Sequence, residues 1–161
     1  WFYSFVIDKG SDDGIQVDMN VLAGSGLAGR MVSVGPNYAR VVSIIADNAN
    51  VYGTILSTSE NLMVSGDLQS VMSDGVIRFE QLYDKENKVS EGDKVVTSNI
   101  SNKYLPGIPI GFISSISTSY NNMTKYGYIT PAVDFQHMQE VLVIMELKQQ
   151  VTQEKHSMDK E

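Results

Sequence analysis

The stretch GSGLAGRMVSVGP, residues 24–36, decides the fold, because glycines stand directly before and inside a run of strand-forming residues. Its first six residues match the spacing G-x-G-x-x-G, and Asp47 follows at about the distance of a ribose-binding acid. A dinucleotide site needs these glycines to open a helix, but the valines after Gly29 favour a strand, and the Gly-Pro pair at 35–36 would end a helix early. The stretch therefore predicts a sharply bent strand in a small barrel and no dinucleotide site.

Strand-like runs recur along most of the chain. About eleven segments are rich in Val, Ile and aromatic residues, and Gly, Asp, Asn and Pro separate them. We identify no convincing helix before the C-terminus, so the pattern predicts an all-β fold with antiparallel sheets. The segments are 1–8, 19–23, 27–34, 39–46, 50–56, 62–66, 75–82, 94–98, 110–117, 126–135 and 140–147.

A weak internal repeat refines this prediction. GIQVDMNV leading into GLAGRMVSV resembles GDKVV leading into GIPIGFISSI, with a glycine near the start of the second strand in each case. Two similar halves predict two small antiparallel β-barrels, resembling the chymotrypsin-like double barrel but without a catalytic triad. We place the barrels at about residues 1–70 and 71–147, with segments able to cross between them, and a flexible tail at 148–161. Six glycines are expected at turns or bends: Gly10, Gly14, Gly26, Gly29, Gly107 and Gly111.

Composition excludes several classes of partner. The 161 residues are 42% apolar and 19% charged, so the chain can bury a core, and its net charge is −7. Binding to nucleic acid or to an anionic membrane surface requires clustered Lys and Arg, which the sequence lacks. No apolar run approaches the roughly 18 residues of a membrane span. Because the chain begins at Trp1 inside a strand-like run, we expect it to be a fragment of a longer protein.

Catalytic and metal-binding patterns are weak. The segment DKGSDDG at 8–14 lacks the ligand spacing of an EF-hand calcium loop. Ser25 and Ser65 follow or precede glycine but miss the G-x-S-x-G elbow of serine hydrolases, and His137 is the one histidine before the tail. No histidine pair or histidine–carboxylate cluster has the spacing of a metal site. We therefore expect no enzyme, no cofactor and no metal.

Exposed aromatic residues are the candidate binding residues. Tyr126 and Tyr128 lie in a late strand-like run, and a barrel this small cannot bury every large ring. Tyr104, Leu105 and Pro106 form an apolar turn in NKYLPGIPIG. That turn either contacts a partner or closes one end of a barrel, and both alternatives remain open at this point. An unpaired edge strand is a further candidate for self-assembly.

Several longer motifs together resemble the MreC family of bacterial rod shape-determining proteins. They are W-x-x-x-F-x-I-D-K-G-S-x-D-G-I, GLAGRMVSVGP, VVTSNISNKYLPGIPIGFISSI and YITPAVDFQHMQEVLVI, and they cover residues 1 to about 147 in the family's order. Asn99 departs from the family pattern, in which many relatives have Gly. Asparagine tolerates a turn that needs positive φ, so this change is expected to be harmless.

The resemblance implies a non-enzymatic scaffold of the cell-elongation machinery. Such proteins bind the class B penicillin-binding transpeptidase, work with MreD, RodA and MreB (the last indirectly or through a missing N-terminal part), and self-associate. It further implies an extracytoplasmic region of two β-barrels, anchored by an upstream membrane helix absent from this sequence. The alternative is a peptidoglycan- or carbohydrate-binding module that uses Tyr126 and Tyr128.

Overall fold

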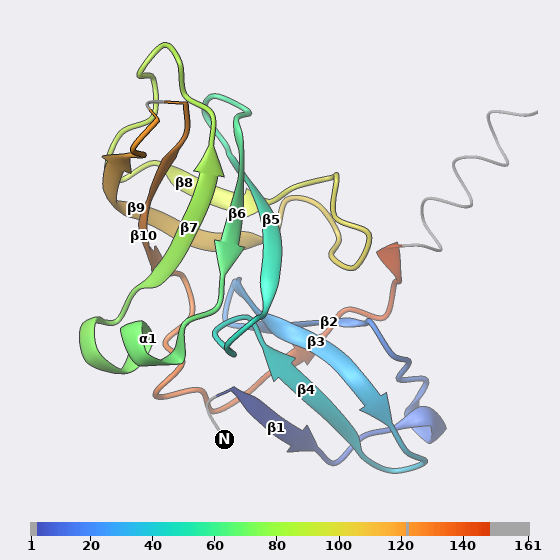
Figure 1. Ribbon diagram of the computed structural model, residues 1–161. Helices are drawn as coiled ribbons and strands as arrows, with labels where there is room; N and C mark the ends of the chain where they lie inside the picture. The colour runs from blue at the N-terminus through green and yellow to red at the C-terminus, as the bar shows by residue number, and fades with distance from the viewer. Residues whose placement is uncertain (1–2, 122, 149–161) are drawn as a thin grey trace, which may run out of the picture.

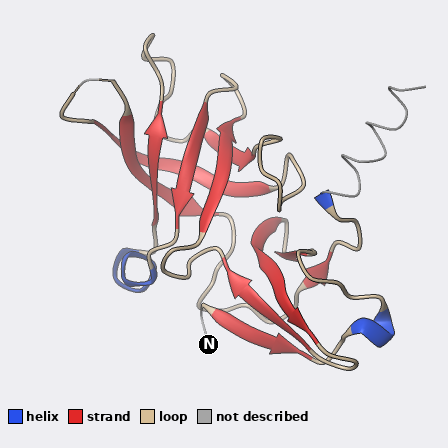
Figure 2. Cartoon of the chain, turned by 45° about the vertical axis from the view of Figure 1, so that its right-hand side comes forward, coloured by secondary structure: helices blue, strands red, loops and turns tan. Residues whose placement is uncertain are grey.

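Two antiparallel β-sheets lie against each other in the computed structural model, which describes residues 3–121 and 123–148 (Figure 1). One sheet is a closed barrel of six strands in the order β10-β7-β6-β5-β8-β9, and the second has five strands in the order β1-β4-β3-β2-β11. The all-β prediction is confirmed, with one closed barrel and one five-stranded sheet. Figure 2 shows that strands and loops make up most of the described chain.

The strands match the segments expected from the sequence closely. The barrel consists of β5 (Asn50–Ile55), β6 (Asn61–Ser65), β7 (Ile77–Leu82), β8 (Lys94–Thr97), β9 (Pro109–Thr118) and β10 (Lys125–Pro131). The second sheet consists of β1 (Ser4–Ile7), β2 (Asn20–Ala23), β3 (Gly26–Val34), β4 (Ala39–Ser43) and β11 (Leu142–Val143).

Alternating burial explains why these segments form strands. In β10, Gly127 and Ile129 are buried while Tyr126, Tyr128 and Thr130 are exposed. Successive side chains of a strand point to opposite faces, so this pattern places the apolar residues inside the barrel and the tyrosines outside. Burying each large apolar side chain stabilises the fold by about 1.5–3 kcal/mol.

The two sheets do not coincide with residues 1–70 and 71–147. Strands β5 and β6 pair with β8 and β7 of the barrel, and β11 returns from the end of the chain to pair with β2. The residues between β10 and β11 carry Val133 and Phe135, which are 4% and 2% exposed. Because these side chains are buried, the returning segment belongs to the core and ties the two sheets together.

Two glycines have matching positions in the two sheets. Gly29 in β3 lies opposite Val21 of β2, and Gly111 in β9 lies opposite Val95 of β8, with a register shift beside each pair. A Cβ at Gly29 would overlap the backbone of Val42, and a Cβ at Gly111 would overlap the carbonyl oxygen of Thr130. The weak repeat in the sequence therefore has a structural counterpart at sites where neighbouring backbones approach closely.

The expectation that no helix precedes the C-terminus is wrong. Helix α1 (Leu68–Asp74) lies between β6 and β7, beside the lower end of the barrel in Figure 1, and a short 3-10 helix spans Ser11–Asp13. Asp67 caps α1 by accepting a hydrogen bond from the Ser70 backbone N–H, and Gly75 ends it with φ +68°. These two caps stabilise α1, although its apolar pattern is too short to predict a helix.

Candidate interaction surfaces

The connection between β8 and β9 folds back onto the five-stranded sheet. The Asn20 side chain, 1% exposed, donates to the Lys103 carbonyl oxygen at 2.9 Å and accepts from the Leu105 backbone N–H at 2.9 Å. The Lys103 ammonium lies 2.8 Å from one oxygen of Asp18, and Arg30 lies 2.8 Å from the other. We call Asp18, Asn20, Arg30 and Lys103 the junction clamp, because they join the barrel connection to the second sheet. Sequence reasoning missed this clamp, since Lys103 lies 83 residues after Asn20 and 85 after Asp18.

The predicted contact residues of this connection differ in accessibility. Tyr104 is 5% exposed, Leu105 is half-buried and Pro106 is exposed. Burial raises the pKa of Tyr104 to about 12, while the nearby Arg30 guanidinium acts in the opposite direction. These observations favour packing over partner contact for Tyr104. Asn99, earlier in the same connection, does not have positive φ, so the change from glycine there requires no left-handed backbone.

The outer face of β9, β10 and β7 carries a group of exposed aromatic side chains. Tyr126 and Tyr128 are 49% and 39% exposed on β10, and Phe112 of the neighbouring β9 is 45% exposed. Phe112 is paired with Thr130 of β10, which lies two residues after Tyr128 on the same face. On the other side of β10, Arg78 of β7 is paired with Tyr128. We call Phe112, Tyr126, Tyr128 and Arg78 the aromatic face. Sequence reasoning identified the two tyrosines but missed Phe112, which the alternation of β9 could have revealed.

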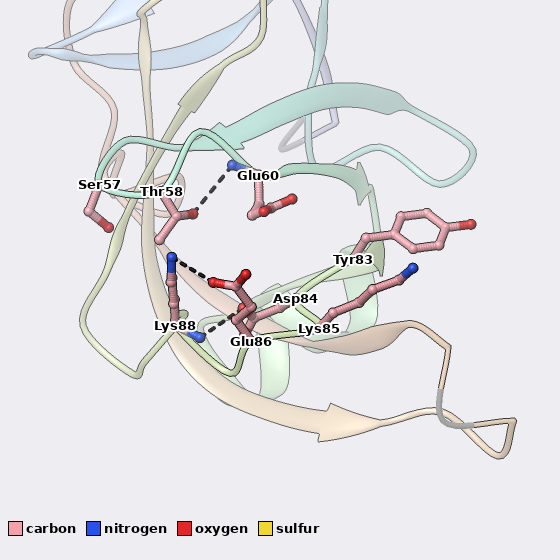
Figure 3. A pocket seen from close by; sticks show the side chains of 8 residues that line it. All are labelled: Ser57, Thr58, Glu60, Tyr83, Asp84, Lys85, Glu86 and Lys88. Atoms are coloured by element: carbon pink, nitrogen blue, oxygen red, sulfur yellow. Dashed lines mark hydrogen bonds and ion pairs between the residues drawn. The ribbon is translucent and has the colours of Figure 1, made fainter.

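A polar pocket of about 700 Å³ opens at one end of the barrel (Figure 3). The turn between β5 and β6 lines it with Ser57, Thr58 and Glu60, and the loop after β7 lines it with residues 83–86 and Lys88. The Lys88 ammonium lies 2.6 Å from the Glu86 carboxylate, and both side chains are largely exposed. The lining offers hydroxyl groups and charges of both signs, and it contains no histidine.

Asp84 stabilises the wall of this pocket rather than its open space. Its carboxylate accepts hydrogen bonds from the backbone N–H groups of Lys88 and Val89 at 2.8 and 3.1 Å and from the Lys125 ammonium at 2.9 Å. Burial alone would raise the pKa of Asp84, but these hydrogen bonds outweigh it and hold the pKa below its ordinary value. Asp84 therefore remains ionised and orders the loop after β7.

The remaining candidate residues are His137 and the glycines of the fingerprint. His137 Nδ1 lies 2.9 Å from Asp134 Oδ2, but both side chains are mostly exposed and the pocket beside them contains no serine. Gly24 lies in the turn before β3, and the other two fingerprint glycines lie inside that strand, so they do not open a helix. Among residues 3–121 and 123–148, no three His, Cys, Asp or Glu side chains are grouped to bind a metal.

Four further glycines named in the sequence analysis lie at close contacts or have positive φ. A Cβ at Gly10 would overlap the Gly35 carbonyl oxygen, and one at Gly26 would meet Val133. Gly14 and Gly107 have φ of +85° and +81°. The predicted tail begins at Lys148, whose ammonium donates to the Asn99 carbonyl oxygen at 3.0 Å. The rest of that tail, 149–161, lies outside the described residues.

Comparison with protein families gives a match over most of the chain. Residues 1–145 match the family of the rod shape-determining protein MreC, barrel core. The cell shape-determining protein MreC of Listeria monocytogenes is 33% identical over 147 residues, covering 89% of this chain and 48% of that protein. The chain thus spans about half the length of the curated relatives it matches.

Solved structures give the same fold. A structure of MreC from Listeria monocytogenes aligns with a TM-score of 0.79 at 28% identity, covering 89% of this chain and 68% of that one. A complex between penicillin-binding protein PBP2 and MreC from Helicobacter pylori aligns with a TM-score of 0.64 at 12% identity, covering 89% and 87%. Within the described part of this chain, no helix is both long and apolar enough for a membrane span.

Proposed function

The chain belongs to the MreC family of rod shape-determining proteins, and from this premise we propose that it is a non-enzymatic docking module for a class B penicillin-binding transpeptidase. Such transpeptidases act on peptidoglycan, so the proposal places the module outside the cytoplasmic membrane. The Helicobacter pylori complex of PBP2 with MreC supports this choice of partner. The role requires a surface that binds one conformation of the transpeptidase more tightly than another.

The aromatic face is the observation that carries the proposal. Phe112, Tyr126 and Tyr128 project from two adjacent strands of a closed barrel, and each is more than a third exposed. Aromatic and Arg side chains are enriched at the energetic centres of protein interfaces. Their backbone is paired on both sides, because β10 lies between β9 and β7, so the rings are presented on a rigid support.

The test replaces the aromatic face and measures binding to the transpeptidase. We expect the double variant Tyr126→Ser, Tyr128→Ser to bind the purified transpeptidase ectodomain at least 10-fold more weakly, because truncating a central interface aromatic typically costs about 2 kcal/mol or more. The melting temperature should change little, since both side chains point away from the core. Tyr83→Ser on the rim of the polar pocket is the matched control and should bind normally. Full-strength binding by the double variant would refute the assignment of this face.

Exposed Pro106 offers a second contact in the same proposal. It follows buried Tyr104 and half-buried Leu105 in the chain, and the packing of these two side chains would hold the turn in place. Substituting Tyr104 by Asp should lower the melting temperature sharply because it would bury a charge. Pro106→Ser should leave the fold intact, so weaker transpeptidase binding by that variant would indicate direct contact.

A peptidoglycan-binding module is the alternative that the aromatic face also allows. Tyr126 and Tyr128 lie at alternate positions of one strand, a spacing that lets two rings contact successive units of a sugar chain. Saturable binding of soluble wall fragments, abolished by Tyr128→Ala, would favour this alternative over a protein-binding scaffold. The proposal further includes self-association and joint action with MreD, RodA and, indirectly, MreB, as the family resemblance implies.

A further inference from the structure

The polar pocket at the end of the barrel has two walls that internal hydrogen bonds hold in place. In the turn between β5 and β6, the Ile55 backbone N–H donates to the Glu60 carbonyl oxygen at 2.8 Å and closes the turn. In the loop after β7, the Lys125 ammonium joins Asp84 and Asn87 at 2.9 and 2.6 Å. The pocket is therefore preformed, and a ligand would bind without first ordering either wall.

The charged groups of the lining are not all used within the protein. Asp84 is occupied by its hydrogen bonds to the loop, and the Glu86 carboxylate is paired with the Lys88 ammonium at 2.6 Å. The charged groups of the other two ionisable residues at the pocket, Glu60 and Lys85, form no ion pair or hydrogen bond with any described residue. One negative and one positive group therefore remain available to a ligand.

These two free charges belong to opposite walls. Glu60 is half-buried at the end of the turn, and in Figure 3 its side chain extends toward the loop that carries Glu86. Lys85 lies on that loop and is exposed, and it extends in the same direction as Tyr83. Ser57 on the turn and Tyr83 on the loop add hydroxyl groups, which both donate and accept hydrogen bonds. The pocket thus presents an anion on one wall, a cation on the other, and hydroxyl groups on both.

This arrangement favours a ligand that carries both charges. A ligand with a single charge would leave the opposite protein charge unpaired in the pocket, and a neutral sugar would leave both unpaired. A short peptide with a free N-terminal ammonium and a free C-terminal carboxylate pairs with both, and its amide groups can bind the hydroxyl groups. Three extended residues separate the two ends by about 10 Å, which suits a pocket of about 700 Å³.

We propose that the polar pocket binds a short zwitterionic peptide, with the peptide ammonium at Glu60 and the peptide carboxylate at Lys85. Two sources could supply this chemistry, a free peptide and a peptide attached to the wall glycan. The site does not depend on the proposed function, because its lining shares no residue with the aromatic face. Transpeptidase binding and peptide binding can therefore fail independently.

The test titrates the protein with tri-alanine at pH 6.5, where the peptide ammonium, with an ordinary pKa of about 8, is protonated. We expect saturable binding, with the largest NMR shifts at residues 57–60 and 83–88. Acetylating the N-terminus or amidating the C-terminus should each weaken binding about 5-fold, because each change removes one charged pair. The absence of saturable tri-alanine binding, or equal binding of the peptide capped at both ends, would overturn the proposal.

Variants of the protein test which group binds which end of the peptide. Glu60→Gln should bind tri-alanine about 5-fold more weakly and should no longer distinguish the free from the acetylated N-terminus. Lys85→Met should likewise lose its sensitivity to amidation of the C-terminus. Glu91→Gln, at an exposed carboxylate outside the lining, is the control and should bind as the parent does. Variants that remain as sensitive to capping as the parent would refute the assignment of the two ends.

Soluble wall fragments distinguish the two sources of the peptide. The fragments chosen have peptides with a free ammonium and a free carboxylate, and they compete with tri-alanine for the pocket. Tighter binding than tri-alanine would assign the pocket to peptides on the wall glycan, and weaker binding would assign it to free peptides. Tyr128→Ala, which alters the aromatic face alone, should leave this competition unchanged.

Discussion

Single buried charges show how this fold holds its loops in place. Asp84 has a side chain that is 2% exposed, yet it stays ionised because two backbone N–H groups and the Lys125 ammonium all donate to it. A buried carboxylate is tolerated only where its acceptors are filled in this way. The same carboxylate fixes the loop after β7 and hence the shape of the polar pocket.

Replacing this charge should give a pH-dependent loss of stability. Asp84→Asn replaces one acceptor oxygen by an amide N–H₂, which would face donors that now bind the carboxylate. We therefore expect the free energy of unfolding to fall by about 2–3 kcal/mol at pH 7. The folded-state pKa of Asp84 is lowered from its ordinary value of 3.8. Its contribution is therefore present above about pH 4 and is lost as the pH falls through the folded pKa. Urea unfolding at pH 7, 5 and 3 should show the two proteins converging at the lowest pH. Glu91→Gln, at an exposed carboxylate, is the control, and an unchanged gap at pH 3 would contradict the argument.

Tyr104 should give the opposite pH dependence. Its pKa is raised from 10.0 to about 12 by burial, so the folded state resists ionisation more than the unfolded state. Its stabilising contribution is complete below pH 10 and is lost as the pH rises from 10 to 12. Tyr104→Phe should be less stable by about 1 kcal/mol at pH 7, because the hydroxyl contact with Arg30 is lost.

Alkaline unfolding distinguishes this effect from general loss of structure. Between pH 10 and 12 the parent should lose its advantage over Tyr104→Phe, since phenylalanine does not ionise. Fluorescence-detected unfolding across this range, with Tyr83→Phe as an exposed control, measures the difference. A constant gap between parent and variant would show that Tyr104 is not protected from ionisation.

At the scale of strands and helices, the sequence predicts what depends on local pattern. The alternation in 126–135 and the β-branched residues in 39–46 indicate strands, and β10 and β4 lie there. Helix α1 was missed because its stability depends on the caps Asp67 and Gly75 rather than on an apolar period. The sequence did not show at which residue the chain passes from the second sheet into the barrel, where β5 and β6 lie. The sheet that a strand joins depends on its pairing with distant segments.

The same limit applies to the candidate surfaces. Tyr126 and Tyr128 could be predicted as exposed because small barrels cannot bury all their rings, and the alternation of β10 places both outside. The burial of Tyr104 could not be predicted, because it depends on the clamp between Asn20 and a connection about 80 residues later. The sequence gives the residue type and the local strand pattern, whereas the fold determines which distant residue each side chain contacts.

Gly111 should be intolerant of any side chain. A Cβ there would overlap the Thr130 carbonyl oxygen, and Ile129 lies at 2.7 Å from the same position. Because the obstacle is backbone of a paired strand, β9 and β10 would have to separate. We expect Gly111→Ala to destabilise the protein by about 3 kcal/mol. Ser114→Ala, at an exposed position of the same strand, should change stability by less than about 0.5 kcal/mol. Chemical denaturation measures both, and similar values for the two variants would contradict a close backbone contact.

At the scale of the whole molecule, the two sheets should behave as one body. The buried residues form one continuous hydrophobic cluster that includes Leu27 of β3 and Ile110 of β9. The junction clamp adds polar contacts, and Val133 of the returning segment packs beside Gly26 of β3. A rigid relation between the sheets would hold the aromatic face in a fixed position relative to the five-stranded sheet.

Calorimetry can test this rigidity through Asn20. Asn20→Ala removes the side chain that binds the Lys103 carbonyl oxygen and the Leu105 N–H. We expect the free energy of unfolding to fall by about 2–3 kcal/mol. Unfolding should nevertheless remain a single transition, with calorimetric and van't Hoff enthalpies equal, because the shared apolar cluster still couples the sheets. Asn102→Ala, exposed in the same connection, should melt like the parent. Two separate transitions in Asn20→Ala would instead mean that the clamp, and not the common core, makes the barrel and the five-stranded sheet unfold together.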